Sequence, residues 1–220
     1  MKRYLPFLIV ACVAAIAFGG GFALYRRKPA APQSAAPSTV KDEAGMHVRG
    51  KKDAAVTIEE FGEFQCPPCS MMATVLKKIE EDYKDRVRLI FHHFPLANHA
   101  NARPAAHAVE AAHLQGHFWE MHDLLYKEQN NWAKATDVAP LLIGYAGSIG
   151  LDTERFKKDM ESEATKERVE ADHAFGASRG VTSTPTLFLN NTLLPASSLN
   201  PDALRKAIDE ALKPKDKPKP

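Results

Sequence analysis

The chain has 220 residues, of which 45% are hydrophobic and 25% are charged, and it contains three cysteines. This length fits one domain, or one domain with an insertion. The composition excludes collagen-like, coiled-coil and wholly disordered proteins. Three cysteines are too few for a disulfide-scaffold protein or for the four thiolates of an iron–sulfur cluster.

The formal net charge of +2 hides an uneven distribution along the chain. Residues 1–28 hold five basic side chains and no acid, and residues 213–220 hold four lysines and one aspartate. The 184 residues between them hold 20 basic and 26 acidic side chains, a net charge of −6. Because the excess of positive charge lies at the two ends, it does not indicate a nucleic-acid partner.

Residues 1–28 predict a segment for export or membrane insertion. The run from Tyr4 to Tyr25 holds 22 uncharged residues with basic residues on both sides, long enough to span a bilayer as a helix. A cleaved signal peptide is the alternative, with Ala15-Ile16-Ala17 as its cleavage site. A lipoprotein signal ending at Cys12 is disfavoured, because the apolar run continues well beyond that residue. Each interpretation places the rest of the chain outside the cytoplasm.

The remainder divides into a linker, a body and a tail. Residues 29–45 are rich in Pro, Ala and Ser and predict a semi-extended linker. Residues 213–220 (KPKDKPKP) cannot bury apolar surface and predict a disordered tail. Residues 46–212 remain as one folded domain of ordinary size.

The body begins with a strand pattern, a helix pattern and a second strand pattern. Residues 55–61 (AVTIEEF) are β-branched and alternate between apolar and polar, which predicts a strand. From Cys66 to Tyr83, apolar residues spaced by three and four predict an amphipathic helix. Residues 87–94 (VRLIFHHF) predict a second strand. This order implies a parallel strand pair joined by a right-handed crossover.

Residues 97–179 have no convincing strand pattern and predict several helices. Breaks between these helices are expected near Gly116, near Asn130-Asn131 and between Gly147 and Gly150. The sequence therefore predicts an all-helical insertion of about 97–179 within the body.

The last part of the body predicts a hairpin and a helix. Residues 186–194 predict two short strands joined by a turn at Asn190-Asn191, because asparagine tolerates the positive φ that such a turn requires. Asn200-Pro201-Asp202 predicts the start of a final helix that runs to Lys213. Together the elements predict an α/β fold with the helical insertion between two halves of a small sheet.

The motif Cys66-Pro67-Pro68-Cys69 follows the first predicted strand and opens the helix. A cysteine at a helix N-terminus faces unpaired backbone N–H groups and the positive end of the helix dipole, which both favour the thiolate. We therefore expect a lowered pKa for Cys66, whose accessible sulfur would act as the nucleophile. Cys69, one turn further, is expected to be more buried and to resolve mixed disulfides. The two prolines fit the first turn, where N–H groups have no intrahelical acceptor.

Other roles for the cysteine pair fit the sequence less well. A zinc site would need two further ligands, and the chain has no second cysteine pair. A structural disulfide across four residues would stabilise the fold little. A C-x-x-C pair in a strand–helix–strand context instead predicts redox catalysis.

Glu60 and Thr184-Pro185 are candidate partners of the cysteines. Glu60 shares its strand face with apolar residues, so it is expected to point inward beneath the redox pair, where a buried carboxylate can relay a proton. A solvated strand acid is the alternative, because Glu59 and Glu63 flank it. Pro185 opens a strand, and a cis bond before it would leave the Thr184 backbone free to pair with an extended substrate.

Four separated motifs carry a resemblance to a known family. The runs VTIEEFGEFQCPPC, FHHFPL, GHFWEMHDLLY and GVTSTPTLFLNNTLLP occur in this order within residues 46–212. They resemble the DsbA-like thiol:disulfide oxidoreductases of bacterial envelopes, above all the membrane-anchored branch. The resemblance implies a thioredoxin-like fold with an inserted all-helical domain, preceded by an N-terminal transmembrane or signal segment. It also implies Cys66 as nucleophile, Cys69 as resolving thiol, Glu60 as the buried acid and Thr184-Pro185 as the cis-proline loop.

The resemblance implies a dithiol oxidase that introduces disulfides into exported, cysteine-containing polypeptides. Its catalytic domain would be tethered in the periplasm or otherwise outside the cytoplasmic membrane. A quinone-linked membrane partner of the DsbB or VKOR-like type would reoxidise the cysteine pair. No bound cofactor, metal or nucleic acid is expected.

One departure from the family pattern bears on the direction of the reaction. The best-known strong oxidants of the family have Pro-His between the cysteines, whereas this chain has Pro67-Pro68. The motif therefore lacks a histidine that would stabilise the thiolate. Two alternatives stay open: a reductase or isomerase of the same fold, and an envelope metal-binding module or metallochaperone that uses Cys66, Cys69 and a histidine.

Overall fold

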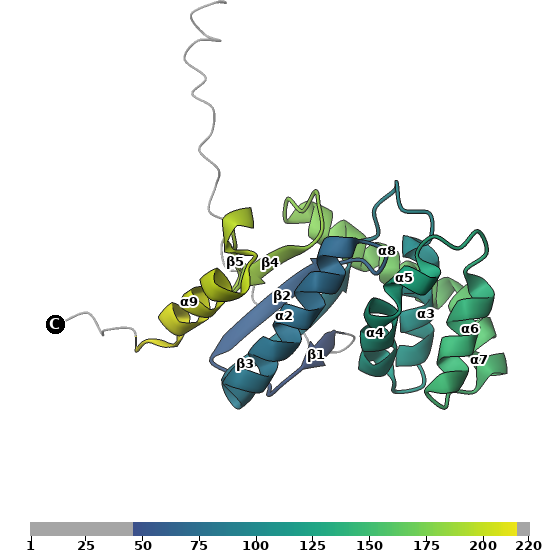
Figure 1. Ribbon diagram of the computed structural model, residues 1–220, viewed down its shortest axis with the longest axis horizontal. Coiled ribbons are helices and arrows are strands. Elements are labelled where there is room, and N and C mark those ends of the chain that lie inside the picture. Colours follow the sequence, from purple (N-terminus) through teal and green to yellow (C-terminus); the bar gives the residue numbers. More distant parts are fainter. Residues whose placement is uncertain (1–45, 215–220) are drawn as a thin grey trace, which may run out of the picture. The chain divides into compact units, whose positions relative to one another are not determined.

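The computed structural model describes residues 46–214, whose arrangement is shown in Figure 1. The predicted export segment at 1–28, the linker at 29–45 and all but the first two residues of the predicted tail lie outside the described residues. Within residues 46–214, no helix combines the length and the apolar character needed to cross a bilayer.

A five-stranded sheet organises the described domain, with the strand order β1-β3-β2-β4-β5 (Figure 1). The strands span His47–Arg49 (β1), Val56–Gly62 (β2), Val87–His93 (β3), Thr186–Leu189 (β4) and Thr192–Leu193 (β5). β2 and β3 are parallel, whereas β1 pairs with β3, and β4 pairs with β2 and β5, in antiparallel fashion. The predicted strand–helix–strand unit is confirmed: α2 (Pro67–Tyr83) and the short 3-10 helix η1 (Lys84–Arg86) connect β2 to β3.

The stretch between β3 and β4 is helical, as the sequence predicts. Its helices are Ala102–His113 (α3), Phe118–Lys127 (α4), Gln129–Trp132 (α5), Ala139–Ser148 (α6), Thr153–Glu161 (α7) and Glu163–Ser178 (α8). The break expected near Asn130-Asn131 falls at Glu128, between α4 and α5, and both asparagines lie inside α5. Burial of Trp132, whose indole N–H donates to the carbonyl of Leu125 at 2.8 Å, outweighs the weak helix propensity of asparagine there.

The hairpin and the final helix lie where the sequence predicts them. Asn190 and Asn191 turn the hairpin with φ of 45° and 68°. The final helix α9 (Pro201–Leu212) follows the 3-10 helix η2 (Ala196–Ser198), and it ends one residue before the predicted Lys213. The side chain of Asn200 accepts a hydrogen bond from the Ala203 backbone N–H at 3.0 Å, so it caps the helix as predicted.

β1 was not predicted, because three residues are too short to show an alternating pattern. Contacts with distant segments hold it against β3. The side chain of His47 contacts Glu110 of α3 at 2.6 Å, and the indole N–H of Trp119 in α4 donates to the Val48 carbonyl at 3.1 Å. This edge strand therefore depends on the helical insertion.

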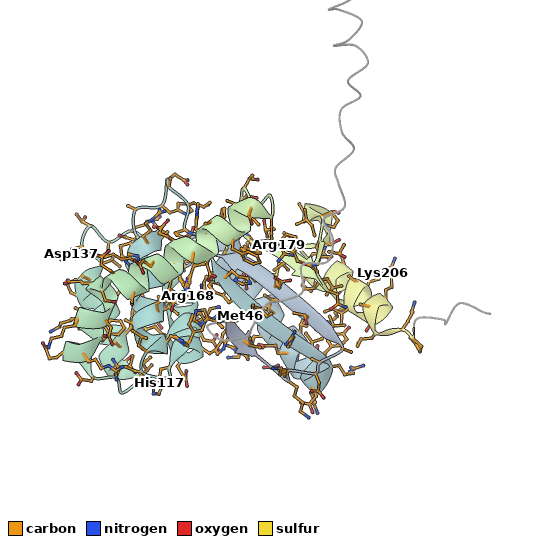
Figure 2. All side chains as sticks on the ribbon, turned by 180° about the vertical axis from the view of Figure 1, so that it is seen from behind. Met46, His117, Asp137, Arg168, Arg179 and Lys206 are labelled. Carbon is orange, nitrogen blue, oxygen red and sulfur yellow. The ribbon has the colours of Figure 1, made fainter. Side chains whose placement is uncertain are left out.

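Helices cover both faces of the sheet. On one face, α2 and α9 contribute apolar side chains to a cluster with the inward residues of β2, β3 and β4. Its fully or nearly buried members include Val56, Ile58, Leu76, Ile79, Leu89, Leu187, Leu204 and Ile208. On the opposite face, the C-terminal part of α8, which ends next to Arg179 (Figure 2), packs against the sheet beside a smaller cluster that includes Phe61, Phe94 and Phe188.

A third apolar cluster joins the helical insertion to the N-terminus of α2. It contains Cys66 and Cys69 together with Phe64, and it extends to buried residues of α3 to α7 such as Trp132 and Phe156. The insertion therefore packs directly around the redox motif.

Gly176 tests how closely α8 packs against the cluster that contains Phe61 and Phe94. A Cβ atom at Gly176 would lie 2.8 Å from ring atoms of both Phe61 and Phe94. We expect Gly176→Ala to lower the free energy of unfolding by roughly 1–3 kcal/mol through overpacking. Gly144→Ala is the matched control, since a Cβ there meets no atom within 4 Å of it and alanine favours the helix by about 0.5–1 kcal/mol. Urea unfolding measures the free energy of unfolding of both variants. Equal changes in the two would contradict the close contact between α8 and the two phenylalanine rings.

Candidate active site

The two cysteines lie at the N-terminus of α2. Cys66 is the N-cap residue, Pro67 and Pro68 occupy the first two helical positions, and Cys69 follows in the first turn. Both prolines are exposed, whereas Cys69 is fully buried and Cys66 is only 4% exposed. The expected deeper burial of Cys69 is confirmed. The expectation of an accessible Cys66 sulfur is wrong in this structure, because the helical insertion and Thr184 pack against that residue.

The two thiols, which are unbonded here, differ strongly in acidity. The hydrogen bond from the Cys69 thiol is the largest influence on Cys66, and it lowers the pKa of Cys66 to about 6 against the opposing effect of burial. The backbone N–H of Cys69 adds to this lowering, as expected for a residue that precedes a helix. Burial raises the pKa of Cys69 far above its usual range. A thiolate at Cys66 and a neutral thiol at Cys69 therefore stabilise each other.

Glu60 lies beneath the cysteines in the interior. It sits in β2 opposite Phe91 and Leu187, it is 0% exposed, and neither of its carboxylate oxygens has a hydrogen-bond partner among the described residues. Burial is the main cause that raises the pKa of Glu60 to about 8, and the charge of Cys66 adds to it. The expected inward orientation is confirmed, and the alternative of a solvated strand acid is wrong because α2 and the insertion cover this part of the sheet.

Tyr126 of α4 is a part of this site that the sequence did not reveal. Its hydroxyl is buried, has no hydrogen-bond partner among the described residues, and lies near Glu60 across Gly62. A Cβ atom on Gly62 would lie 3.1 Å from Glu60 Oε1 and 3.2 Å from the Tyr126 hydroxyl. Burial raises the pKa of Tyr126, and Cys69 and Glu60 raise it further. Gly62 therefore leaves the space into which both polar groups point.

The loop before β4 completes the site. The peptide bond between Thr184 and Pro185 is cis, and the Thr184 carbonyl oxygen lies 3.5 Å from Cys66 Sγ. Both residues are partly exposed. The structure thus brings the loop to Cys66 and places Glu60 close enough for its charge to interact with both cysteines.

A separate buried cluster contains the metal-capable residues found in the described part of the chain. His47, His93 and Glu110 offer ligand atoms that lie within 4.8 Å of one another, and neither cysteine belongs to this group. Glu110 Oε1 contacts Nε2 of His47 at 2.6 Å and Nε2 of His93 at 2.9 Å, so two imidazoles satisfy the carboxylate. This arrangement gives no support to a metallochaperone in which the cysteines and a histidine share one ion.

Comparisons with known proteins agree with this geometry. A family model described as Thioredoxin matches residues 41–210. A probable disulfide bond formation protein D from Bacillus anthracis is 35% identical over 173 residues, which cover 74% of this chain and 77% of that protein. The oxidised BdbD structure from Bacillus subtilis superimposes with a TM-score of 0.69 at 27% identity, covering 78% of this chain and 95% of that one. The chain therefore belongs to the thioredoxin family, among its DsbA-like thiol:disulfide oxidoreductases.

Two further comparisons concern a solved structure of lower identity and a much longer sequence. The structure of alpha-DsbA1 from Wolbachia pipientis shares the fold with a TM-score of 0.64 at 20% identity. A sequence named Na(+)/H(+) antiporter NhaA 1 from Salinispora arenicola is 36% identical over 180 residues, which cover 79% of this chain. The chain spans only 26% of the length of that antiporter, so the match concerns one part of a longer protein.

The protonation of Glu60 predicts an unusual pH dependence of stability. With a folded pKa of about 8 and an unfolded pKa near 4.5, Glu60 holds a proton in the folded state that the unfolded chain releases. Its contribution to stability is complete below pH 4.5 and is lost as the pH rises to about 8. In the reduced protein, Glu60→Gln should therefore gain roughly 4 kcal/mol of unfolding free energy relative to the unmodified chain between pH 4.5 and 8.

Urea unfolding at a series of pH values measures this difference. Glu120→Gln, at an exposed position of α4, is the control and should show no such gain. A difference between the Glu60→Gln protein and the unmodified chain that does not vary with pH would show that Glu60 is ionised in the folded state.

Proposed function

We propose that this domain is a dithiol oxidase that introduces disulfides into exported polypeptides, with Cys66 as nucleophile and Cys69 as resolving thiol. The observation that carries the proposal is the difference in acidity between the two thiols at one helix N-terminus. A stabilised Cys66 thiolate favours the reduced form of the pair. Stabilising the reduced form makes the corresponding disulfide a stronger oxidant.

The first step joins the substrate to Cys66 in a mixed disulfide. A substrate thiolate attacks Cys66 of the oxidised pair, a new S–S bond forms, and the Cys66–Cys69 bond breaks. Cys69 leaves as a thiolate and takes up a proton, because burial raises its pKa far above neutral. Glu60, whose pKa of about 8 keeps it protonated at neutral pH, lies beneath the pair and donates that proton.

The second step releases the product. A second substrate thiolate attacks the substrate sulfur of the mixed disulfide, and Cys66 leaves as a thiolate. A pKa of about 6 makes this sulfur a good leaving group at neutral pH. The substrate loses two electrons and gains a disulfide, while the cysteine pair becomes reduced.

Substrate binding is assigned to the loop at Thr184-Pro185 and to the exposed start of α2. An extended chain whose cysteine approaches Cys66 would pass the partly exposed Thr184 backbone. Pro67, Pro68 and the 66% exposed Met71 offer apolar contacts beside it. Backbone pairing with a few apolar contacts suits unfolded polypeptides, because it requires no particular sequence.

The proposed reaction belongs outside the cytoplasmic membrane. Disulfides persist in oxidising compartments, and residues 1–28 predict export or a membrane anchor. Each turnover leaves the pair reduced, so a second protein must remove two electrons. A quinone-linked membrane partner of the DsbB or VKOR-like type is the class that the family resemblance supports.

Trapping experiments test the roles of the two cysteines. Cys69→Ser leaves Cys66 without its resolving thiol, so mixed disulfides with exported proteins should accumulate. Cys66→Ser leaves a buried thiol of raised pKa, and no mixed disulfides should form. Acid-quenched, alkylated samples on non-reducing gels measure both, and the opposite pattern would mean that the roles are exchanged.

The direction of the reaction needs a second assay. Oxidised protein mixed with one equivalent of a reduced two-cysteine peptide should convert most of the peptide to its disulfide form. Variants that lack either cysteine should convert none. Reduction of the oxidised peptide by the reduced protein, with negligible reaction in the forward direction, would contradict the oxidase and favour a reductase.

A further inference from the structure

The redox motif carries no basic residue between its cysteines, yet a histidine from another segment lies beside it. His99 belongs to the loop between β3 and α3, and its side chain contacts the carboxylate of Glu63. Glu63 follows β2 directly and precedes Cys66 by three residues. The fold therefore brings a cation-capable side chain to a site where the motif itself provides none.

Glu63 is a buried carboxylate with both oxygens engaged. It is only 2% exposed; Oε1 contacts Nδ1 of His99, and Oε2 accepts a hydrogen bond from the Gln65 backbone N–H at 2.8 Å. The carbonyl of Glu63 also accepts a hydrogen bond from the Cys66 backbone N–H at 3.4 Å. Glu63 is thus linked to the nucleophile through the backbone and to His99 through its side chain.

Additional hydrogen bonds fix the loop that carries His99. The Gln65 side chain accepts from the Asn101 backbone N–H at 2.7 Å and donates to the Ala133 carbonyl at 2.8 Å. The Asn101 side chain donates to the carbonyls of Ala133 and Ala135. Because these bonds tie the loop to the segment before Cys66 and to the insertion, the position of His99 is built into the fold.

Several titratable groups face this pair. Cys66 and Cys69 lie beside Glu63 at the start of α2, and Tyr126 of α4 also interacts with Glu63. Glu60 of β2 interacts with both cysteines. Burial raises the pKa of Glu63, whereas His99 and the Gln65 backbone N–H oppose the rise. An unpaired carboxylate at Glu63 would repel a thiolate at Cys66, whereas His99 attracts it.

We propose that His99 is a positioning residue for the thiol:disulfide exchange: it pairs with Glu63 and so offsets the charge of that carboxylate beside Cys66, in a motif where Pro67-Pro68 offers no basic side chain. This inference rests on the proposed role of Cys66 as nucleophile. It does not depend on whether the enzyme oxidises or reduces its substrates. His99 acts through Glu63 rather than by touching the substrate.

A double-mutant cycle tests the proposal on the reduced protein. The rate of Cys66 alkylation by iodoacetamide, followed from pH 4 to 9, reports the thiolate fraction without any substrate. His99→Asn should raise the apparent pKa of Cys66, so that alkylation near pH 6 slows by roughly three- to fivefold. Glu63→Gln combined with His99→Asn should restore the rate to within about twofold of the unmodified protein, because the repelling charge is then absent as well.

Two further variants separate charge from structure. His99→Lys keeps a cation beside Glu63 and should retain the alkylation profile of the unmodified protein more closely than His99→Asn does. His117→Asn is the matched control, since His117 pairs with Glu120 at 3.6 Å at the start of α4. This substitution should leave the profile unchanged, and urea unfolding of every variant shows that each is folded.

Two results would overturn the proposal. One is a Cys66 alkylation profile that His99→Asn leaves unchanged. The other is a double variant as slow as His99→Asn alone, which would show that His99 does not act by cancelling the Glu63 charge. Either result concerns the thiolate alone, so the oxidase would still be tested separately by its reaction with the two-cysteine peptide.

Discussion

The unequal acidity of Cys66 and Cys69 is the constraint on which the chemistry proposed for this domain depends. The neighbouring Cys69 thiol lowers the pKa of Cys66, while Cys69 remains protonated because burial raises its own pKa. This difference in protonation requires the Cys66 sulfur at the N-terminus of a helix and the Cys69 sulfur inside the core. The β2–α2 turn provides the first condition, and the helical insertion packed around Phe64 and Cys69 provides the second.

Strand β2 and the residues that follow it carry three acids in three different environments. Burial opposes ionisation of Glu59, but His92 and Arg179 outweigh it and lower the pKa of that carboxyl. Glu60, on the opposite face, has no partner among the described residues, so its carboxyl stays protonated at neutral pH. Glu63, just beyond the strand, pairs with the histidine of a neighbouring loop. In the proposed mechanism, the unpaired Glu60 is the acid that supplies a proton to the cysteines.

Local sequence signals predicted the elements that carry the redox pair. Alternating and helical patterns defined β2, α2 and β3, and the alternation alone placed Glu60 on the inward face. The features that were missed depend on contacts between distant segments. β1 is held by Glu110 and Trp119, and Tyr126 reaches the site only because Gly62 leaves room. Periodicity within one segment contains no information about such contacts.

The reduction potential of the Cys66–Cys69 pair, measured by equilibration with glutathione, tests the central claim most directly. A stabilised Cys66 thiolate beside a protonated Cys69 predicts a pair clearly more oxidising than thioredoxin, whose potential is about −270 mV. A shift of roughly 30 mV corresponds to a tenfold change in the equilibrium constant, so the two outcomes are well separated. A potential above about −200 mV is the predicted result, and one near −270 mV would contradict the oxidase.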